Sequence, residues 1–372
     1  MKRVINWFVL AGLFLATSCD PSWSPHDAAF NTQGLMVASD KDLTATIISP
    51  SLATPLEAGK NVLWCGTFQL AWNEVCGLVG EDPHFANEPA MVSELNRKEF
   101  SKADLDDESY LALAGFVRDG IFGKIDRGLK DKFKGQASPH LLPRPELTPR
   151  PQDIVAYSYL FKNLQFGTPF ERLQTPMRFA DGNEVAAFGM LAYKPAYEKM
   201  YPQVQILDYR SREDFIIELK TKSVGDRVIL ARVKPGRTLG ETLAAVLPRI
   251  AAAKPASARA GDLLCVPKLN FDLTRDYREL LGRTLIVSNP KVAKDLTILS
   301  AVQNIRFQFD EEGVRLRSES HLSFGCGVEA GPVPEHIMVF DGPFLILMRR
   351  TTAKVPYFAL WVGNSDLLVK PE

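Results

Sequence analysis

The sequence has few of the side chains that most often perform catalysis. It contains five histidines and five cysteines among 372 residues, and no histidine lies in the H-E-x-x-H spacing of a zinc protease. G-x-S-x-G and S-x-x-K nucleophile motifs are absent, and so is a glycine-rich phosphate loop after a strand pattern. A Cys–His nucleophile would have to use Cys326, near His321 and His336; the alternative is a flexible loop with an incidental cysteine. We therefore expect no enzyme activity, no metal and no cofactor.

The chain also has no excess of charge of either sign. Lys plus Arg and Asp plus Glu are both 44, so the formal net charge is zero. Nucleic-acid-binding proteins carry a basic excess that replaces the counterions of the phosphates, so we expect no nucleic-acid partner. With 46% hydrophobic and 24% charged residues, the composition is typical of one large globular domain or two ordinary ones.

The N-terminus has the pattern of a secretory signal. Lys2 and Arg3 precede an apolar run over residues 4–16, which ends in small residues just before Cys19. The run is short for a membrane span. It resembles a bacterial lipoprotein signal, in which Cys19 would become the lipidated first residue; the alternative is an ordinary signal peptide that happens to contain a cysteine. The resemblance implies a signal over 1–19 and a lipid anchor in a bacterial envelope, on its periplasmic or surface face. Residues 20–58, rich in Ser, Pro, Ala and Thr, predict a tether, and we expect a single domain over 59–369.

The remaining cysteines are Cys65, Cys76, Cys265 and Cys326. In an oxidising envelope they allow two disulfides in three pairings, and four buried free thiols are the alternative.

Hydrophobic periodicity predicts helices early in the chain and strands later. Helical spacing occurs over 61–79, 106–122, 239–253 and, briefly, 276–281; the proline-rich residues 136–152 predict a loop. Strand patterns cover 153–161, 204–209, 214–219, 227–233, 261–271, 344–349 and 358–362, with a hairpin over 177–190 around Asp181-Gly182. No strand–helix unit repeats, so we expect an α+β fold with helices at the front and a β-rich C-terminal region.

Residues 304–320 read as a strand, an acidic turn and a second strand. Ile305, Phe307 and Phe309 alternate with polar residues, and Val314 and Leu316 alternate with Arg315 and Arg317, which is the period of half-buried strands. The chain either turns back as a hairpin, with Gly313 at positive φ, or runs straight on, with the second half inserted as a strand or held out as a loop. The two arginines predict a face that meets water; a ligand-binding pair is the alternative.

Seven short motifs stand in the same order as in the serpin family. They are an Asn-Val strand and helix at 59–75, the central strand ending Phe161-Lys162 with its hairpin to Met190, Val266-Pro267-Lys268-Leu269, the helix at 272–282, the hinge at 309–313, Phe340-Asp-Gly-Pro-Phe344, and the closing strand at 358–363. The chain therefore resembles a serpin over roughly residues 59–365, with a large, mostly antiparallel central sheet.

In an inhibitory serpin, the reactive loop is held out, is cut by the target protease and then enters the central sheet as a new strand. The resemblance places the hinge at Glu311, Glu312, Gly313 and Val314. By position from Gly313 it places a scissile bond within 324–330, which contains Cys326, Gly327 and Val328. It implies a protease as partner and a monomeric protein.

The departures from the family decide which function we expect. Gly313 is followed by Val-Arg-Leu-Arg in place of small residues, and Cys65-Gly66, Tyr157, Gln303 and Leu164-Gln165-Phe166 replace the residues that line the opening of the family's sheet. Long cations slow insertion and lose side-chain entropy when ordered, and loss of the polar partners predicts a differently packed, static centre. We expect a non-inhibitory binding or structural module; the alternative is an inhibitor of serine or cysteine proteases. An unrelated enzyme would depend on Cys326.

Overall fold

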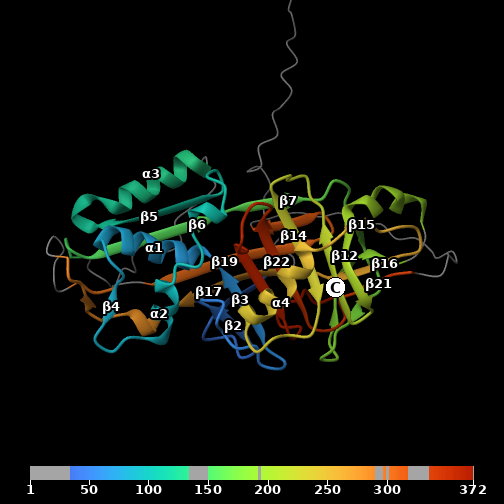
Figure 1. Cartoon of the computed structure of the whole chain (residues 1–372), viewed down its shortest axis with the longest axis horizontal. Coiled ribbons are helices and arrows are strands. Elements are labelled where there is room, and N and C mark those ends of the chain that lie inside the picture. Colours follow the sequence, from blue (N-terminus) through green and yellow to red (C-terminus); the bar gives the residue numbers. More distant parts are fainter. Residues whose placement is uncertain are drawn as a thin grey trace, which may run out of the picture.

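The structure is a computed structural model that describes residues 34–133, 150–191, 194–289, 296–298, 301–316 and 335–371. It is an α+β fold, as expected. Helices α1 (Thr67–Val79), α2 (Ala90–Asn96) and α3 (Ile121–Phe133) gather at one end of an elongated molecule, and large sheets form the rest (Figure 1). Short 3-10 helices cover Lys102–Asp104, Val117–Asp119, Pro195–Lys199, Tyr201–Gln203 and Arg278–Leu280.

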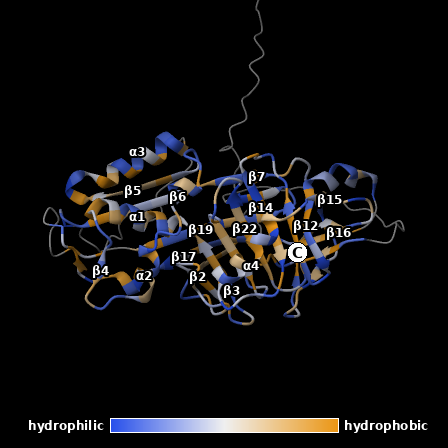
Figure 2. Cartoon of the chain, viewed as in Figure 1, coloured by the Kyte–Doolittle hydropathy of each residue, from blue (hydrophilic) through white to orange (hydrophobic). Residues whose placement is uncertain are grey.

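The largest sheet has eight strands. Their order is β15 (Ala256–Ser257), β12 (Val204–Ser211), β13 (Asp214–Leu219), β14 (Asp226–Arg232), β22 (Phe344–Arg350), β23 (Phe358–Val362), β3 (Asn61–Cys65) and β2 (Thr46–Ser49). Every neighbouring pair is antiparallel except β2 and β3. The five strands predicted within 204–233 and 344–362 are confirmed. Most of their residues are buried, and hydrophobic residues concentrate on these inner strands in Figure 2.

A five-stranded sheet packs against the eight-stranded one. Its order is β1 (Met36–Ser39), β17 (Leu269–Asp276), β19 (Val302–Asp310), β20 (Gly313–Leu316) and β7 (Lys162–Gln165). The predicted alternation of β19 is confirmed: Ile305, Phe307 and Phe309 are buried on one face. The ring of Phe307 stacks on Phe358 of β23 with 4.5 Å between centroids, which joins the two sheets.

Strands β5 (Tyr110–Phe116) and β6 (Ile154–Leu160) pair antiparallel beside this sheet. The chain passes directly from β6 into β7, so residues 154–165 form one continuous extended run. Phe161 and Tyr157 point to α3, whose buried residues recur every four positions from Ile121 to Phe133. Figure 2 shows hydrophobic and hydrophilic residues alternating along this helix. The other face of the run meets α1, where the Ser158 hydroxyl donates to the Thr67 carbonyl.

Two predicted helices are partly or wholly wrong. Residues 106–122 contain the strand β5, and residues 61–79 divide into strand β3 and helix α1. The run Tyr110–Phe116 is apolar on both sides because α1 and α3 cover its two faces, so it lacks the alternation of a half-buried strand. The helix predicted over 239–253 is confirmed as α4 (Leu239–Ala251), and the Thr238 hydroxyl caps it by accepting from the Glu241 amide.

Smaller sheets complete the fold. One consists of β21 (Ile337–Val339), β16 (Leu263–Pro267), β11 (Ala187–Met190) and β8 (Glu171–Arg172). The predicted hairpin around Asp181-Gly182 is confirmed as β9 (Met177–Arg178) and β10 (Glu184–Val185), and β4 (His84–Phe85) pairs with β18 (Leu285–Ile286). Most of the proline-rich loop predicted over 136–152 lies outside the described residues.

The range expected to be a tether, 20–58, contains two strands of the fold. Strand β1 pairs in parallel with β17, and β2 pairs in parallel with β3. Ile48 and Ser49 are buried, at 2% and 0% exposed. The folded unit therefore includes residues before 59.

The described cysteines Cys65, Cys76 and Cys265 are buried free thiols. Burial raises the pKa of Cys65, that of Cys76 to about 11 and that of Cys265 to about 12, so these thiols stay protonated and unreactive at neutral pH. Cys326 lies outside the described residues. Within those residues, no three His, Cys, Asp or Glu side chains are placed to hold a metal ion. The described helices also include none that is long and apolar enough to cross a membrane.

Candidate functional site

Strand β20 lies between β19 and β7 and pairs antiparallel with both. Val314 is opposite Phe309 on one side and Leu164 on the other, and Arg315 is opposite Gln308 and Asn163. The alternatives predicted for residues 304–320 are thus combined: the chain turns back at Asp310–Gly313 as a hairpin, and its second strand is inserted in the sheet. The expected hinge residues Glu311 to Val314 lie together at the start of this strand.

Gly313 is the residue that lets β20 approach β7. Its φ is +153°, a value that residues with a side chain rarely adopt. A Cβ at this position would lie 2.4 Å from the Leu164 carbonyl oxygen and 2.8 Å from the Gln165 Cα. Both are backbone atoms of the paired strand, so neither can move without displacing β7.

The acidic corner before Gly313 is fixed from outside the hairpin. The amides of Phe170 and Phe166 donate to the carbonyls of Glu311 and Glu312, each at 2.8 Å. The Glu311 carboxylate pairs with Lys268 at 2.5 Å, where the exposed fractions of the two side chains are 21% and 12%. These contacts place the corner on the segment that follows β7.

The two faces of β20 differ sharply. Val314 is fully buried among the phenylalanines of the main core. Arg315 is on the opposite face with only 3% of its surface exposed, and its guanidinium pairs with Glu312. The prediction that Arg315 faces water is therefore wrong; the strand enters the middle of a sheet, where both faces are covered. The side chain of Leu316 and all of Arg317 lie outside the described part of the chain.

The described part of β20 ends at Leu316. By register, the next positions of an extended β20 would lie between β6 and β19. Among the described residues, a parallel bridge between Ile154 and Ile298 joins β6 to the segment that precedes β19. We call the region between β6 and β19, from Leu316 to this bridge, the slot.

Thr67, the first residue of α1, holds both sides of the slot. Its carbonyl accepts from the Ser158 hydroxyl of β6, and its hydroxyl accepts from Gln303 Nε2 of β19 at 2.9 Å. Gln303 also donates to the Cys65 carbonyl at 3.0 Å and accepts from the buried Tyr277 hydroxyl at 2.7 Å. We call Thr67, Ser158, Gln303 and Tyr277 the clamp.

The clamp bears on the prediction that the centre of the sheet has lost its polar partners. Gln303 supplies hydrogen bonds inside the sheet, so the polar contacts are rearranged and not lost. Tyr157, in contrast, packs against α3, and burial raises its pKa above the ordinary value. The polar contacts between the strands are therefore made at Thr67, the first residue of α1.

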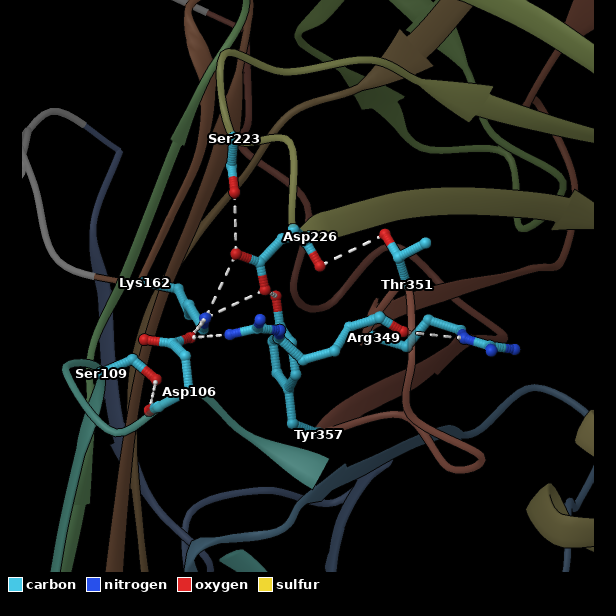
Figure 3. A network of polar contacts seen from close by, with 10 residues as sticks. Asp106, Ser109, Lys162, Ser223, Asp226, Arg349, Thr351 and Tyr357 are labelled. Carbon is cyan, nitrogen blue, oxygen red and sulfur yellow. Dashed lines mark hydrogen bonds and ion pairs between the residues drawn. The ribbon is translucent and has the colours of Figure 1, made fainter. Parts of the chain in front are cut away.

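The first residue of β7, Lys162, is a buried lysine beside the last residue of β20. Lys162 is 5% exposed and is opposite Leu316. Its ammonium group pairs with Asp106 and lies 2.9 Å from Asp226 Oδ1, and it sits 5.3 Å from the centre of the Tyr357 ring (Figure 3). We call this group the Lys162 cluster.

The cluster connects the two large sheets. Asp226 begins β14 and also accepts from Ser223 at 2.9 Å and from the Tyr357 hydroxyl at 3.2 Å, while Arg350 of β22 reaches Asp106 at 2.9 Å. Burial opposes ionisation of Asp106, but the bonds and charge of Lys162 outweigh it and lower the pKa of Asp106. This contribution to stability is present above the ordinary aspartate pKa and is lost as the pH falls through the lowered one.

The sequence has no pattern that unites these residues. Lys162 could be noticed as a cation that ends an apolar strand, but Asp106, Asp226 and Thr67 come from distant segments. The candidate residues of the expected reactive loop, Cys326, Gly327 and Val328, and of the expected signal, Cys19, lie outside the described residues.

Comparison with known proteins gives matches by structure alone. No family model and no curated protein matches the chain. Serpin48 of the insect Tenebrio molitor is 14% identical with a TM-score of 0.45, covering 83% of this chain and 92% of its own. Thyroxine-binding globulin in complex with thyroxine is 12% identical with a TM-score of 0.44, covering 82% and 93%. A serpin of Schistosoma mansoni is 12% identical with a TM-score of 0.42, covering 68% and 65%.

With identities of 12–14% and TM-scores of 0.42–0.45, these likenesses carry no argument about the fold or the activity of this chain.

Replacing Gly313 by alanine should push β20 away from β7. The added Cβ meets backbone at 2.4 Å, so we expect a loss of about 1–3 kcal/mol of stability and faster hydrogen–deuterium exchange at the amides of Val314 and Arg315. Gly182→Ala is the matched control, because Gly182 has φ +89° but nothing within 4 Å of an added Cβ. Equal exchange at β20 in the two variants would contradict this explanation.

Replacing Gln303 by leucine should weaken the clamp. The buried hydroxyl of Tyr277 loses its acceptor, and an orphaned buried group costs roughly 1–3 kcal/mol. The hydroxyl of Thr67 loses the donor Gln303 but keeps its contact with Cys65 Sγ at 3.7 Å. Denaturant unfolding measures this loss. Adding Tyr277→Phe to the Gln303→Leu variant removes one orphan and should restore part of the stability; a double variant less stable than Gln303→Leu alone would show that the clamp is misassigned.

Proposed function

We propose that this chain is a serpin-fold protein of a bacterial envelope that does not inhibit proteases by loop insertion and serves as a binding or structural module. The motif order and the sheet that receives a hinge strand support the fold assignment. In this function the protein has no catalytic residues, and its partner is another protein.

The observation that carries the proposal is the set of residues that would surround position 317 if β20 continued past Leu316. Arg315 already uses Glu312 as its partner. Arg315 is opposite Asn163 and Gln308. If the strand continued in the same register, Arg317 would lie on the same face, between Phe161 and Arg306.

That position is unfavourable for a cation. Phe161 is 8% exposed within the apolar cluster under α3, and a desolvated charge without a partner costs several kcal/mol. Arg306 is a cation on the neighbouring strand, and like charges directly opposite each other in a sheet repel. Its Nη1 donates to Asn270 at 2.6 Å, which keeps the guanidinium over the sheet.

The clamp adds a second obstacle. Full insertion would separate β6 from β19 by up to one more strand spacing, ~4.8 Å. A single residue, Thr67, now bonds to both strands, so at least one of these bonds must break. A hinge strand that ends near Leu316 is therefore favoured over insertion of the residues that follow it.

The alternative function is inhibition of a serine or cysteine protease by insertion of the reactive loop. One observation favours it: β20 already occupies the place between β19 and β7 through which a longer strand would enter. After cleavage, the two functions predict different fates for the loop: it enters the sheet in an inhibitor and stays out of it in a settled module.

Cutting the chain within residues 325–332 should leave the melting temperature within a few degrees of the intact value, because Arg317 and the clamp oppose entry of the freed loop. Limited proteolysis followed by thermal melting measures this, and a gel under denaturing conditions reports whether a covalent complex with the protease forms. A gain of tens of degrees, or such a complex, would establish the alternative.

Arg317→Ala tests the reason for that outcome. If the cation blocks entry, the cut variant should melt higher than the cut parent. Arg237→Ala is the matched control, since Arg237 is a 90% exposed cation at the start of α4. The same shift in both variants would remove Arg317 from the explanation.

We also propose that Cys19 carries a lipid, which would keep the protein on the membrane. Cys19→Ala should move the protein from the detergent phase to the aqueous phase in a phase-separation assay, since the acyl chains supply the membrane affinity. Cys76→Ala, at a buried thiol of α1, should stay in the detergent phase. A parent protein whose N-terminal peptide has no added lipid mass would refute the assignment.

A further inference from the structure

Asp310 is the last residue of β19 and pairs with Gly313 across the hairpin corner. Both of its carboxylate oxygens are used within the hairpin. Oδ1 accepts from the Glu312 amide at 3.0 Å, and Oδ2 accepts from Gln308 Nε2. The side chain is partly buried, so its charge state bears directly on the turn that begins β20.

The charges that face Asp310 come from its own corner, from β20 and from the residue before β17. Glu311 is adjacent and pairs with Lys268; Glu312 pairs with Arg315. The corner thus holds three carboxylates and two cations. Both cations of the corner are already paired with the two glutamates, and Asp310 is held by amide donors instead.

The surroundings disfavour the ionised form of Asp310. Burial, followed by the charge of Glu311, raises its pKa above the ordinary aspartate value. The Glu312 amide, the Arg315 charge and the Gln308 amide act in the opposite direction but do not cancel the effect.

We propose that Asp310 is an acid-responsive switch for the hinge strand: a proton on its carboxyl group tightens the β19–β20 hairpin in the central sheet, and its loss loosens the hairpin. The neutral carboxyl group still accepts from the Glu312 amide through its carbonyl oxygen. Its O–H donates to the Gln308 amide oxygen once that amide turns over.

The direction of the pH dependence follows from the proton balance. The folded hairpin holds this proton more tightly than the unfolded chain does, so the added stability is complete below the ordinary aspartate pKa of about 3.9. It is lost as the pH rises through the raised value. This inference goes beyond the proposed function, because β20 exists whether or not the loop after it can enter the slot.

Hydrogen–deuterium exchange of the full chain tests the switch. Protection factors of the Val314 and Arg315 amides, corrected for intrinsic exchange, are measured from pH 4 to 8, with amides of β22 as the internal reference. We expect β20 protection to fall with rising pH by up to about tenfold per pH unit across the titration, the limit for one proton.

Two variants make the test specific. Asp310→Asn is neutral at every pH and should remove the pH dependence. Glu311→Gln removes the like charge and should move the midpoint to lower pH while keeping the dependence. A parent protein with pH-independent β20 protection, or a dependence that survives in Asp310→Asn, would overturn the proposal. If Asp310→Asn fails to fold, an unmoved midpoint in Glu311→Gln overturns it equally.

Discussion

The structure depends on the close approach of β20 to β7, which only a residue without a side chain permits. Gly313 lies against the backbone of Leu164 and Gln165, and from this contact the next residues gain partners on both sides. The consequence is a hinge strand that is part of the sheet. Val314 joins the core, and Arg315 is forced to the opposite face, where it needs Glu312.

Two polar groups hold the layers around this strand. The Lys162 cluster joins the end of β7 to the eight-stranded sheet through Asp106 and Asp226, and the clamp at Thr67 joins β6 to β19 farther along. A buried cation is stable only where all of its partners are in place, because removing one partner leaves an uncompensated charge. Such groups fix where the sheets lie relative to each other more than they add to net stability.

The function we propose follows from the same geometry. A sheet with an inserted hinge strand is compatible with an inhibitor and with a non-inhibitory binding protein. The side chains around the strand's continuation decide between the two. Here Phe161, under α3, and Arg306 are the residues that would flank the strand if it continued past Leu316, and the proposed function supposes that a second cation placed there would have no partner. The acid-responsive corner at Asp310 would adjust how firmly the short strand is held.

The sequence alone determined the α+β class, the alternating faces of β19, the strands of the C-terminal half, helix α4 and the glycine at the hinge, because each depends on local periodicity or on one residue's conformational freedom. It misassigned β5, whose two covered faces remove the alternation that identifies a strand, and it wrongly predicted that Arg315 meets water. The tertiary structure alone decided the Lys162 cluster, the clamp and the insertion of β20, because these join segments far apart in the chain, and burial and partners in such contacts depend on how the layers pack.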